Sequence, residues 1–269
     1  KRRYCAIMMD METHMDTEVG SVISFSGGRS SAFMLHMLLD EHGGLPDDSE
    51  VIFTNTGKEM PQTLDFVRDC EKQWRVPITW LEYRKGYKYE QVNYDNASRN
   101  GEPFADLIDD RSFLPNSVMR FCTSELKIKT IERYFGKNHT KYIGIRADEP
   151  RRVSRIRAKG DDSIMPLADA GITKQDINEF WANHSFDLNL PNASVNTLSN
   201  CDLCFLKGAA IRKSIIEFQP ELADWWIEQE NKLDSRFSKD SPSYDQLKII
   251  ASDQMQLFDY EIAACFCGD

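Results

Sequence analysis

The sequence predicts an α/β protein built on a doubly wound parallel sheet. Short apolar runs alternate with amphipathic segments, in the order strand, helix, strand, helix, strand, over residues 22–83. That order is typical of a parallel sheet whose strands are joined by right-handed helical crossovers. The chain has 269 residues, 41% of them hydrophobic, which is enough for one large domain or for one domain plus a smaller appendage.

Local signals place the first strands and helices. The apolar run 22–25 ends at Ser26-Gly27-Gly28, where a tight turn is expected. The helical pattern that follows stops at His42-Gly43-Gly44, and the second helix carries Pro61 in its first turn, where proline is well tolerated. The expected strands are 22–25, 51–55 and 77–83, and the expected helices are 30–39 and 60–74.

The rest of the chain gives fewer regular signals. Residues 84–118 are polar and contain several asparagines and glycines, so we expect a long loop or lid over the site. Thr173 followed by Asp176 is a capping pair that marks the start of a helix. We expect helices at 121–135, 173–181 and 206–232, a strand at 141–146, and a short extended piece at 163–167.

Charge and hydropathy exclude several classes of protein. The formal net charge is −10, so the whole chain is not a strong general nucleic-acid binder. The run 151–157, with four arginines, is either a solvated surface or a binding site for a polyanionic substrate. No segment approaches the roughly 18 apolar residues of a membrane helix. The apolar run near the N-terminus breaks at Asp10, which argues against a secretory signal, and we expect a cytoplasmic protein with no membrane partner.

The segment Ser26-Gly27-Gly28-Arg29-Ser30-Ser31 joins the first strand to the first helix. Its glycines let the backbone approach an anion, and the N–H groups at a helix start favour phosphate. The serines add hydroxyl donors. The spacing is neither that of a Walker A loop nor that of a dinucleotide-binding loop. The segment is therefore a phosphate loop of another kind or an ordinary turn with a serine cap.

The cysteines are placed like ligands rather than like core residues. Seven cysteines in a chain without an export signal argue against a disulfide framework. A Cys-x-x-Cys turn is compatible with a redox pair, with half of a zinc site or with half of an iron–sulfur site. We favour a [4Fe–4S] cluster, ahead of no metal and of zinc. The candidate ligands lie among polar or turn residues, and they are Cys122, Cys201, Cys204 and one of Cys265 or Cys267.

Four segments together resemble a known family. The hexapeptide 26–31 resembles the PP-loop of the N-type ATP pyrophosphatases, and in particular of their PAPS reductase-like branch. Segments 53–63, 120–127 and 144–149 resemble three further motifs of that branch, in the same order. The resemblance covers roughly residues 21–210 and implies a Rossmann-like fold of the adenine nucleotide α-hydrolase type.

The resemblance implies roles for individual residues. The phosphates of ATP, shared with Mg²⁺, would lie on the loop and its surroundings. Arg120, Lys127 and Arg146 would supply catalytic cationic charge at the phosphates, because reaction at the α-phosphate spreads negative charge. Thr54, Asn55 and Gly57 would lie beside adenine or ribose. The residues that would bind the phosphates, with Gly144 beside them, are Ser24, Ser26, Gly27, Gly28, Arg29, Ser30 and Ser31.

The C-terminal portion departs from the sulfonucleotide reductases of this branch. Those enzymes carry a catalytic cysteine in a Glu-Cys-Gly-Ile-His motif, and some also carry adjacent cysteines. This chain has Cys267-Gly268-Asp269 and no adjacent cysteines. Segments 144–152 and 186–188 look closer to the phage-borne PAPS reductase-like proteins and to DndC and SspD, the ATP pyrophosphatases of bacterial DNA phosphorothioation.

These features lead to one principal functional hypothesis and three alternatives. We expect an ATP pyrophosphatase, releasing AMP and pyrophosphate, that adenylates an oxygen so that sulfur replaces it. DNA is the expected substrate and a cysteine desulfurase the expected partner. The alternatives are a sulfonucleotide reductase that uses thioredoxin and Cys265 or Cys267, a non-catalytic nucleotide sensor, and a tRNA-thiolating enzyme.

The domain organisation follows from the same motifs. We expect a poorly defined leader over 1–18, a nucleotide-binding core over 19–160 and a C-terminal portion over 161–269. The C-terminal portion is expected to be helical, to carry most of the cysteines and to pack on the core. A homodimer is one oligomeric state that the sequence allows.

Overall fold

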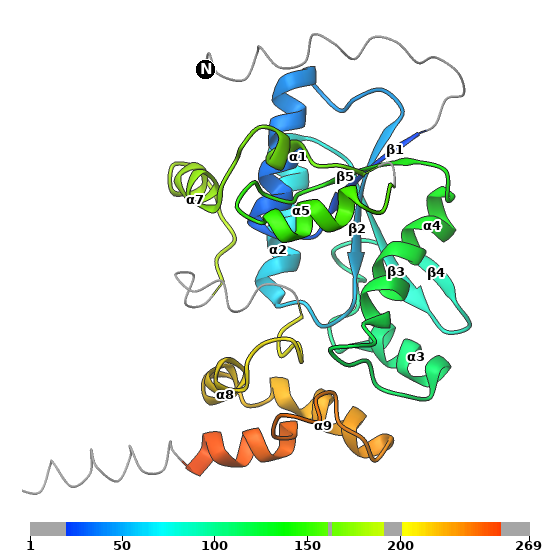
Figure 1. The fold of residues 1–269 in the computed structure, drawn as a ribbon, viewed down its shortest axis with the longest axis vertical. Coiled ribbons are helices and arrows are strands. Elements are labelled where there is room, and N and C mark those ends of the chain that lie inside the picture. Colours follow the sequence, from blue (N-terminus) through cyan, green and yellow to red (C-terminus); the bar gives the residue numbers. More distant parts are fainter. Residues whose placement is uncertain (1–19, 161–162, 191–200, 254–269) are drawn as a thin grey trace, which may run out of the picture. The chain divides into compact units, whose positions relative to one another are not determined.

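The computed structural model describes residues 20–160, 163–190 and 201–253 (Figure 1). The chain divides into two compact units, which interleave along the sequence. Unit 1 holds residues up to 53, 66–79 and 135–188, and unit 2 holds 54–65, 80–134 and the residues from 189 onward. Within the described residues, no helix combines the length and the apolar character that a membrane crossing requires.

Within the described ranges, the strands form a six-stranded, mostly parallel sheet in the order β4-β3-β2-β1-β5-β6. Strand β1 pairs in parallel with both β2 and β5, and β5 pairs in parallel with β6. The β3–β4 pair is antiparallel. The predicted α/β fold class is therefore confirmed. The strands are β1 Ser21–Phe25, β2 Ser49–Asn55, β3 Ile78–Arg84, β4 Lys88–Val92, β5 Thr140–Ile143 and β6 Ser163–Ile164.

Unit 1 packs helices and buried strands around an aromatic cluster. Helix α1 turns Ala32, Leu35 and Leu38 inward at helical spacing and ends at Gly43, whose φ of 68° suits a glycine. The predicted capping pair at the start of α7 is present. Ring contacts join Phe66, Trp74, Phe180, Trp181 and Phe186. The helices are α1 Arg29–His42, α2 Pro61–Trp74 (in this unit from Phe66), α5 Pro150–Arg157, α6 Pro166–Asp169 and α7 Lys174–Ala182.

Unit 2 holds the antiparallel hairpin and the later helices. Its core includes Trp80, Phe104, Trp226, Phe237 and Tyr244, all of them buried. The predicted helix 121–135 is present, but its centre is a π-helical turn, η1, and such turns often lie at functional sites. The helices are α3 Glu102–Arg111, η1 Thr123–Ile128, α4 Lys129–Phe135, α8 Ala209–Phe218 and α9 Leu222–Lys232, and residues 244–253 are also helical.

Three expectations about secondary structure were wrong. Residues 84–118 hold β4 and α3 rather than one long loop, because the exposed β4 lacks the apolar alternation of a half-buried strand. The predicted helix 206–232 is two helices, since Pro220 lies between α8 and α9 and cannot continue a helix. The predicted strand 141–146 already ends at Ile143, before a glycine.

Candidate phosphate-binding and cysteine sites

The turn after β1 leaves the start of helix α1 open to a ligand. Gly27 has a φ of 73°, a conformation that glycine adopts at little cost. Gly28 is the N-cap residue, so no side chain of the cap accepts from the first N–H groups of α1. No acidic residue lies in the first turn of the helix. Within the first turn of α1 itself, no carboxylate side chain competes for the positive end of the helix dipole, which favours anions.

The serines of the loop divide into two groups. Ser31 is buried, accepts from the Ser26 N–H at 3.1 Å and donates to the Gly28 carbonyl at 2.9 Å. It therefore holds the turn closed. Ser26 is exposed, but its hydroxyl donates to Ser31 Oγ at 3.0 Å, so it would have to rotate to donate to a ligand. Ser30 is half-buried at the rim of the turn. Ser24 is half-buried within β1, opposite Ile52 of β2 in the parallel register.

Residues after β5 complete this end of unit 1. A Cβ on Gly144 would lie 3.0 Å from Ser31 Cα, so the start of α1 packs directly on the Gly144 backbone. Arg146 Nη1 donates to Ser30 Oγ at 3.4 Å, and its Nε donates to Asp148 at 2.8 Å. The structure thus brings Gly144 and Arg146 to the loop.

Arg29 belongs to the loop, but its side chain is already engaged. Its Nε donates to Asp187 Oδ1 at 2.7 Å, and its Nη2 donates to the other carboxylate oxygen. The Arg29 carbonyl accepts from Trp181 Nε1 at 3.1 Å. These contacts fix the first residue of α1 against the segment after α7. The sequence analysis named Asp187 only within segment 186–188, which resembles the family. It did not predict the ion pair with Arg29.

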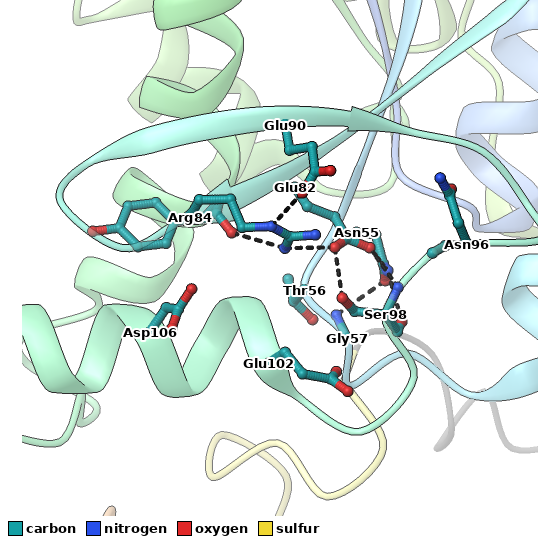
Figure 2. A network of polar contacts seen from close by, with 12 residues as sticks. Asn55, Thr56, Gly57, Glu82, Arg84, Glu90, Asn96, Ser98, Glu102 and Asp106 are labelled. Atoms are coloured by element: carbon teal, nitrogen blue, oxygen red, sulfur yellow. Dashed lines mark hydrogen bonds and ion pairs between the residues drawn. The ribbon is translucent and has the colours of Figure 1, made fainter.

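In unit 2, Asn55 shapes the turn that follows β2 (Figure 2). Its amide donates to Glu82 Oε1 at 2.6 Å and to the Ser98 carbonyl at 2.8 Å, and its Oδ1 accepts from Gly57 N at 3.0 Å. Asn55 and Glu82 are both 0% exposed. Gly57 has a φ of 76°, and a Cβ there would lie 2.9 Å from Pro103. Asn55 and Gly57 therefore make their contacts with other protein atoms, and Thr54 beside them is also buried.

Glu82 is the centre of this network, and the sequence did not single it out. It accepts from Ser98 N at 2.7 Å and from Ser98 Oγ at 2.6 Å. It also pairs with Arg84 Nη1 at 2.7 Å, and Arg84 reaches on to Glu90, as Figure 2 shows. A carboxylate in the middle of an otherwise apolar strand was the signal that could have revealed it, since such a charge requires partners.

A second group in unit 2 surrounds Cys201. Glu59 and Cys201 form an isolated antiparallel bridge, and Thr56 Oγ1 lies 3.5 Å from Cys201 Sγ. Glu59 Oε2 accepts from Thr56, while its Oε1 lies 3.6 Å from Lys127 Nζ and accepts no hydrogen bond. Lys127 is thus directed at Glu59 and the thiols.

The protonation of this group follows from burial and neighbouring charge. Burial, and then the nearby Glu59 carboxylate, raises the pKa of Cys201 well above its ordinary value. Burial and then Cys204 raise the pKa of Cys122. Burial alone would lower the pKa of Lys127, but Glu59 and the two thiols raise it overall. Lys127 is therefore a cation at neutral pH, and Cys201 and Cys122 are thiols.

The described residues do not form a metal site. Among them, no group of three or more histidines, cysteines, aspartates or glutamates is arranged to hold a metal ion. Cys122, Cys201 and Cys204 are free thiols, and Cys265 and Cys267 lie outside the described residues. The three described thiols alone do not fit the predicted iron–sulfur ligand set.

A buried ion pair fixes the Cys-x-x-Cys turn. Lys58 Nζ lies 2.9 Å from Asp202 Oδ2, with both side chains at most 6% exposed. Asp202 also accepts from Trp226 Nε1 at 2.8 Å, and its N–H donates to the Lys58 carbonyl at 2.7 Å. The Lys207 ammonium donates to the Cys201 carbonyl at 2.8 Å. These contacts position Cys201 and Cys204 without using their sulfur atoms.

Besides Lys127, the segment 120–127 holds one exposed and one buried charge. Arg120 is exposed. Glu125 is 1% exposed and pairs with three basic side chains, from Arg111, Lys129 and Arg133. Burial alone would raise the pKa of Glu125, but the hydrogen bonds from Lys129 and Arg133 lower it overall. Glu125 therefore ties the π-helical turn to its neighbours.

A mostly parallel sheet whose first strand leads through a Gly-Gly turn into an uncapped helix is typical of phosphate-binding α/β proteins. Comparison with known proteins makes the class specific. Residues 20–189 match the model of the phosphoadenosine phosphosulfate reductase domain, and the chain belongs to that family. This finding confirms the PAPS reductase-like part of the sequence-based prediction.

Three curated relatives are similar over parts of their length. The uncharacterized nin region protein ORF290 of Escherichia phage lambda is 34% identical over 202 residues, which cover 70% of this chain and 66% of the relative. Two uncharacterized proteins of Methanocaldococcus jannaschii are 25% and 29% identical over 48% and 42% of this chain. The chain spans 23% and 22% of those two relatives. These relatives include no DndC or SspD protein, so that resemblance stays a prediction.

The chain trace is similar to that of several solved structures. One of them is the U34-tRNA thiolase NcsA from Methanococcus maripaludis with its [4Fe–4S] cluster. The two proteins share 15% sequence identity and a TM-score of 0.41, over 90% of this chain and 74% of the thiolase. A similarity of this size supports no conclusion about function.

Proposed function

We propose that this protein is an ATP pyrophosphatase that cleaves ATP between the α- and β-phosphates. The observation that carries the proposal is the open N-terminus of α1 after the Ser26-Gly27-Gly28 turn, with Arg146 hydrogen-bonded to Ser30 at its rim. Members of the phosphoadenosine phosphosulfate reductase family are generally enzymes, and this chain matches the family over residues 20–189. The geometry supplies N–H groups, hydroxyls and a cation, which together suit a polyphosphate.

The residues of the loop and Arg146 would have different roles in binding the nucleotide. The N–H groups at the start of α1 and the hydroxyls of Ser26 and Ser30 would bind the phosphates. Arg146 would neutralise charge that develops at the α-phosphate, and Gly27 and Gly28 would let the backbone approach. Mg²⁺ would come to the site bound to the nucleotide phosphates, whose oxygens it prefers as ligands.

The remaining predicted residues belong to unit 2. Lys127 stays a proposed catalytic cation, and its contact with Glu59 keeps it charged. Arg120, which is exposed, stays a proposed cation as well. Asn55 and Gly57 would act by shaping the turn after β2, since their polar groups are turned to other protein atoms.

The proposed reaction activates an oxygen for replacement by sulfur. An acceptor oxygen attacks the α-phosphorus of ATP, the bond to the β-phosphate oxygen breaks, and pyrophosphate leaves. The terminal sulfur of a persulfide then attacks the adenylated phosphorus and displaces AMP, and a thiol reduces the resulting disulfide so that one sulfur stays on the acceptor. The acceptor that we propose is a DNA backbone phosphate, with a cysteine desulfurase as sulfur donor, because of the resemblance to the phosphorothioation proteins.

Pyrophosphate release from ATP by anaerobically purified protein, with and without DNA, tests this function. Ser26→Ala and Arg146→Ala should each lower ATP affinity and pyrophosphate release, whereas the exposed control Arg236→Ala should not. Release that DNA stimulates, without sulfite from PAPS, supports the proposal. Sulfite without ATP cleavage would establish the sulfonucleotide reductase instead, and ATP binding without cleavage would establish a nucleotide sensor.

The iron–sulfur cluster stays a separate proposal. It would need Cys122, Cys201 and Cys204 to rearrange and one of the cysteines near the C-terminus to join them. Iron and acid-labile sulfide in the anaerobic protein, lost in a Cys204→Ser variant, would support it. Protein without iron after anaerobic purification would rule it out.

A further inference from the structure

Helix α5 concentrates positive charge on the surface of unit 1. Between Pro150 and Gly160 the chain carries four arginines and one lysine and no acidic residue, although its net charge is −10. None of the residues of α5 is buried, and all four arginines are exposed. The helix thus contributes little to the core, and its charges face solvent.

The four arginines fall into two pairs with different surroundings. Arg152 pairs with Glu149, and Arg157 donates to Asp169 at 2.7 Å, so both are neutralised within the protein. Arg151 and Arg155 form no ion pair with any acidic residue that the structure describes. They lie four residues apart and therefore on one face of the helix. Like charges at this spacing destabilise a helix, and a bound anion would relieve that repulsion.

The basic residues extend past the helix at one end and lie near the phosphate loop at the other. Lys159, which is exposed, lies in the turn just after α5. At the other end, Glu149 accepts from the Arg146 N–H at 3.2 Å and pairs with Arg152 of α5. Arg146 is the residue that donates to Ser30 of the loop. Glu149 therefore anchors the start of α5 to the rim of the loop, and all of these residues belong to unit 1.

We propose that the row Arg151, Arg155 and Lys159 binds the phosphodiester backbone of DNA and holds a backbone phosphate near the loop. The choice of DNA rests on the proposed function. Arg151 and Arg155 lie four helical residues apart, which is about 6 Å along the helix axis, and phosphates of one strand are spaced roughly 3.4 Å along the duplex axis. The two arginines therefore match nearby phosphates of one strand, and Lys159 follows in the turn after α5. Arginine forks suit phosphate oxygens, and such contacts position DNA without reading its sequence.

The test is DNA binding in the absence of ATP. The binding of a short fluorescent DNA duplex would be followed by anisotropy over a series of salt concentrations. The test variant is Arg151→Gln with Arg155→Gln, and the control is Arg75→Gln with Arg236→Gln, two exposed arginines outside α5. Glutamine keeps the helix propensity of arginine, and the two double variants lose the same charge. The thermal unfolding midpoint of each variant checks its fold.

We expect the α5 variant to bind DNA at least about tenfold more weakly at low salt, with a salt slope smaller by about 2. The control should bind like the wild type. Equal affinity of wild type and α5 variant, or an equal loss in the control, would overturn the proposal. So would tighter binding of an RNA duplex than of the DNA duplex by the wild type.

The two proposals fail separately. DNA binding through this row, combined with no pyrophosphate release under any condition, would overturn the proposed function. It would still support DNA binding by the row. Pyrophosphate release, combined with wild-type DNA affinity in the α5 variant, would overturn the proposal that the row binds DNA. It would still support the ATP pyrophosphatase activity.

Discussion

Gly144→Ala is the substitution that most directly tests the phosphate loop. Gly144 follows β5, and a Cβ there would lie 3.0 Å from Ser31 Cα, 3.2 Å from Ser31 N and 3.3 Å from the Ser30 carbonyl carbon. All three neighbours are backbone atoms at the start of α1, so no side chain can rotate away. The added methyl group must therefore move the first turn of α1, β5 or both.

The size of the effect follows from the cost of overpacking. Inserting a methyl group into a packed site costs about 1–3 kcal/mol. If the first turn of α1 moves to relieve the contact, the N–H groups that face the ligand move with it. Each 1.4 kcal/mol corresponds to about a tenfold change in affinity, so ATP affinity should fall roughly 5- to 100-fold.

The assay is calorimetric titration with ATP, alongside thermal unfolding. The control is Gly44→Ala, because a Cβ at Gly44 meets nothing within 4 Å. The control should keep both ATP affinity and unfolding midpoint. A Gly144→Ala protein that loses stability but binds ATP like the wild type would refute the assignment of ATP to this loop. Unchanged affinity together with unchanged stability would refute the close packing of Gly144 on Ser31.

Two further predictions concern buried carboxylates of unit 2. Glu82→Ala removes the buried carboxylate that accepts from Asn55 and Ser98 and pairs with Arg84, and it should lower the free energy of unfolding by about 3 kcal/mol. Glu90→Ala, at the 54% exposed partner of the same arginine, should lower it by less than about 1 kcal/mol in the same urea titration, and equal losses would contradict this difference. Because the pKa of Glu125 is below its ordinary value of 4.5, its contribution to stability is complete above that pH and is lost as the pH falls below it. The stability difference between wild type and Glu125→Gln should shrink with falling pH, and a constant difference would refute the role of this charge.

The local structure of the candidate phosphate loop could be predicted because its determinants are close together in the sequence. An apolar run, two glycines and a helical pattern follow one another over residues 22–39, and the structure places β1, the turn and α1 there. The alternation of strands and helices likewise predicted the parallel part of the sheet. Both signals depend on local periodicity and on the special conformations of glycine, which the sequence displays directly.

The partners that complete the site could not be predicted in the same way. Arg29 and Asp187 are 158 residues apart, and Asn55 and Glu82 are 27 residues apart. No periodicity links residues at such separations. Helix α3 was missed for a different reason, since its buried residues Phe104, Leu107 and Ile108 have helical spacing but lie in a segment judged polar as a whole. A shorter window over that segment would have revealed the helix.

The three cations that the family motifs assigned to one role have different surroundings in the structure. Arg146 donates to Ser30 of the loop, whereas Lys127 is directed at Glu59 and the thiols of unit 2. Arg120 is exposed in the same unit as Lys127. The order of the motifs could not distinguish the roles of these three residues, because it depends on sequence position and not on contacts. The contacts therefore make Arg146 the first residue to test for ATP binding, and they make Lys127 the residue whose substitution should first alter the reactivity of Cys201.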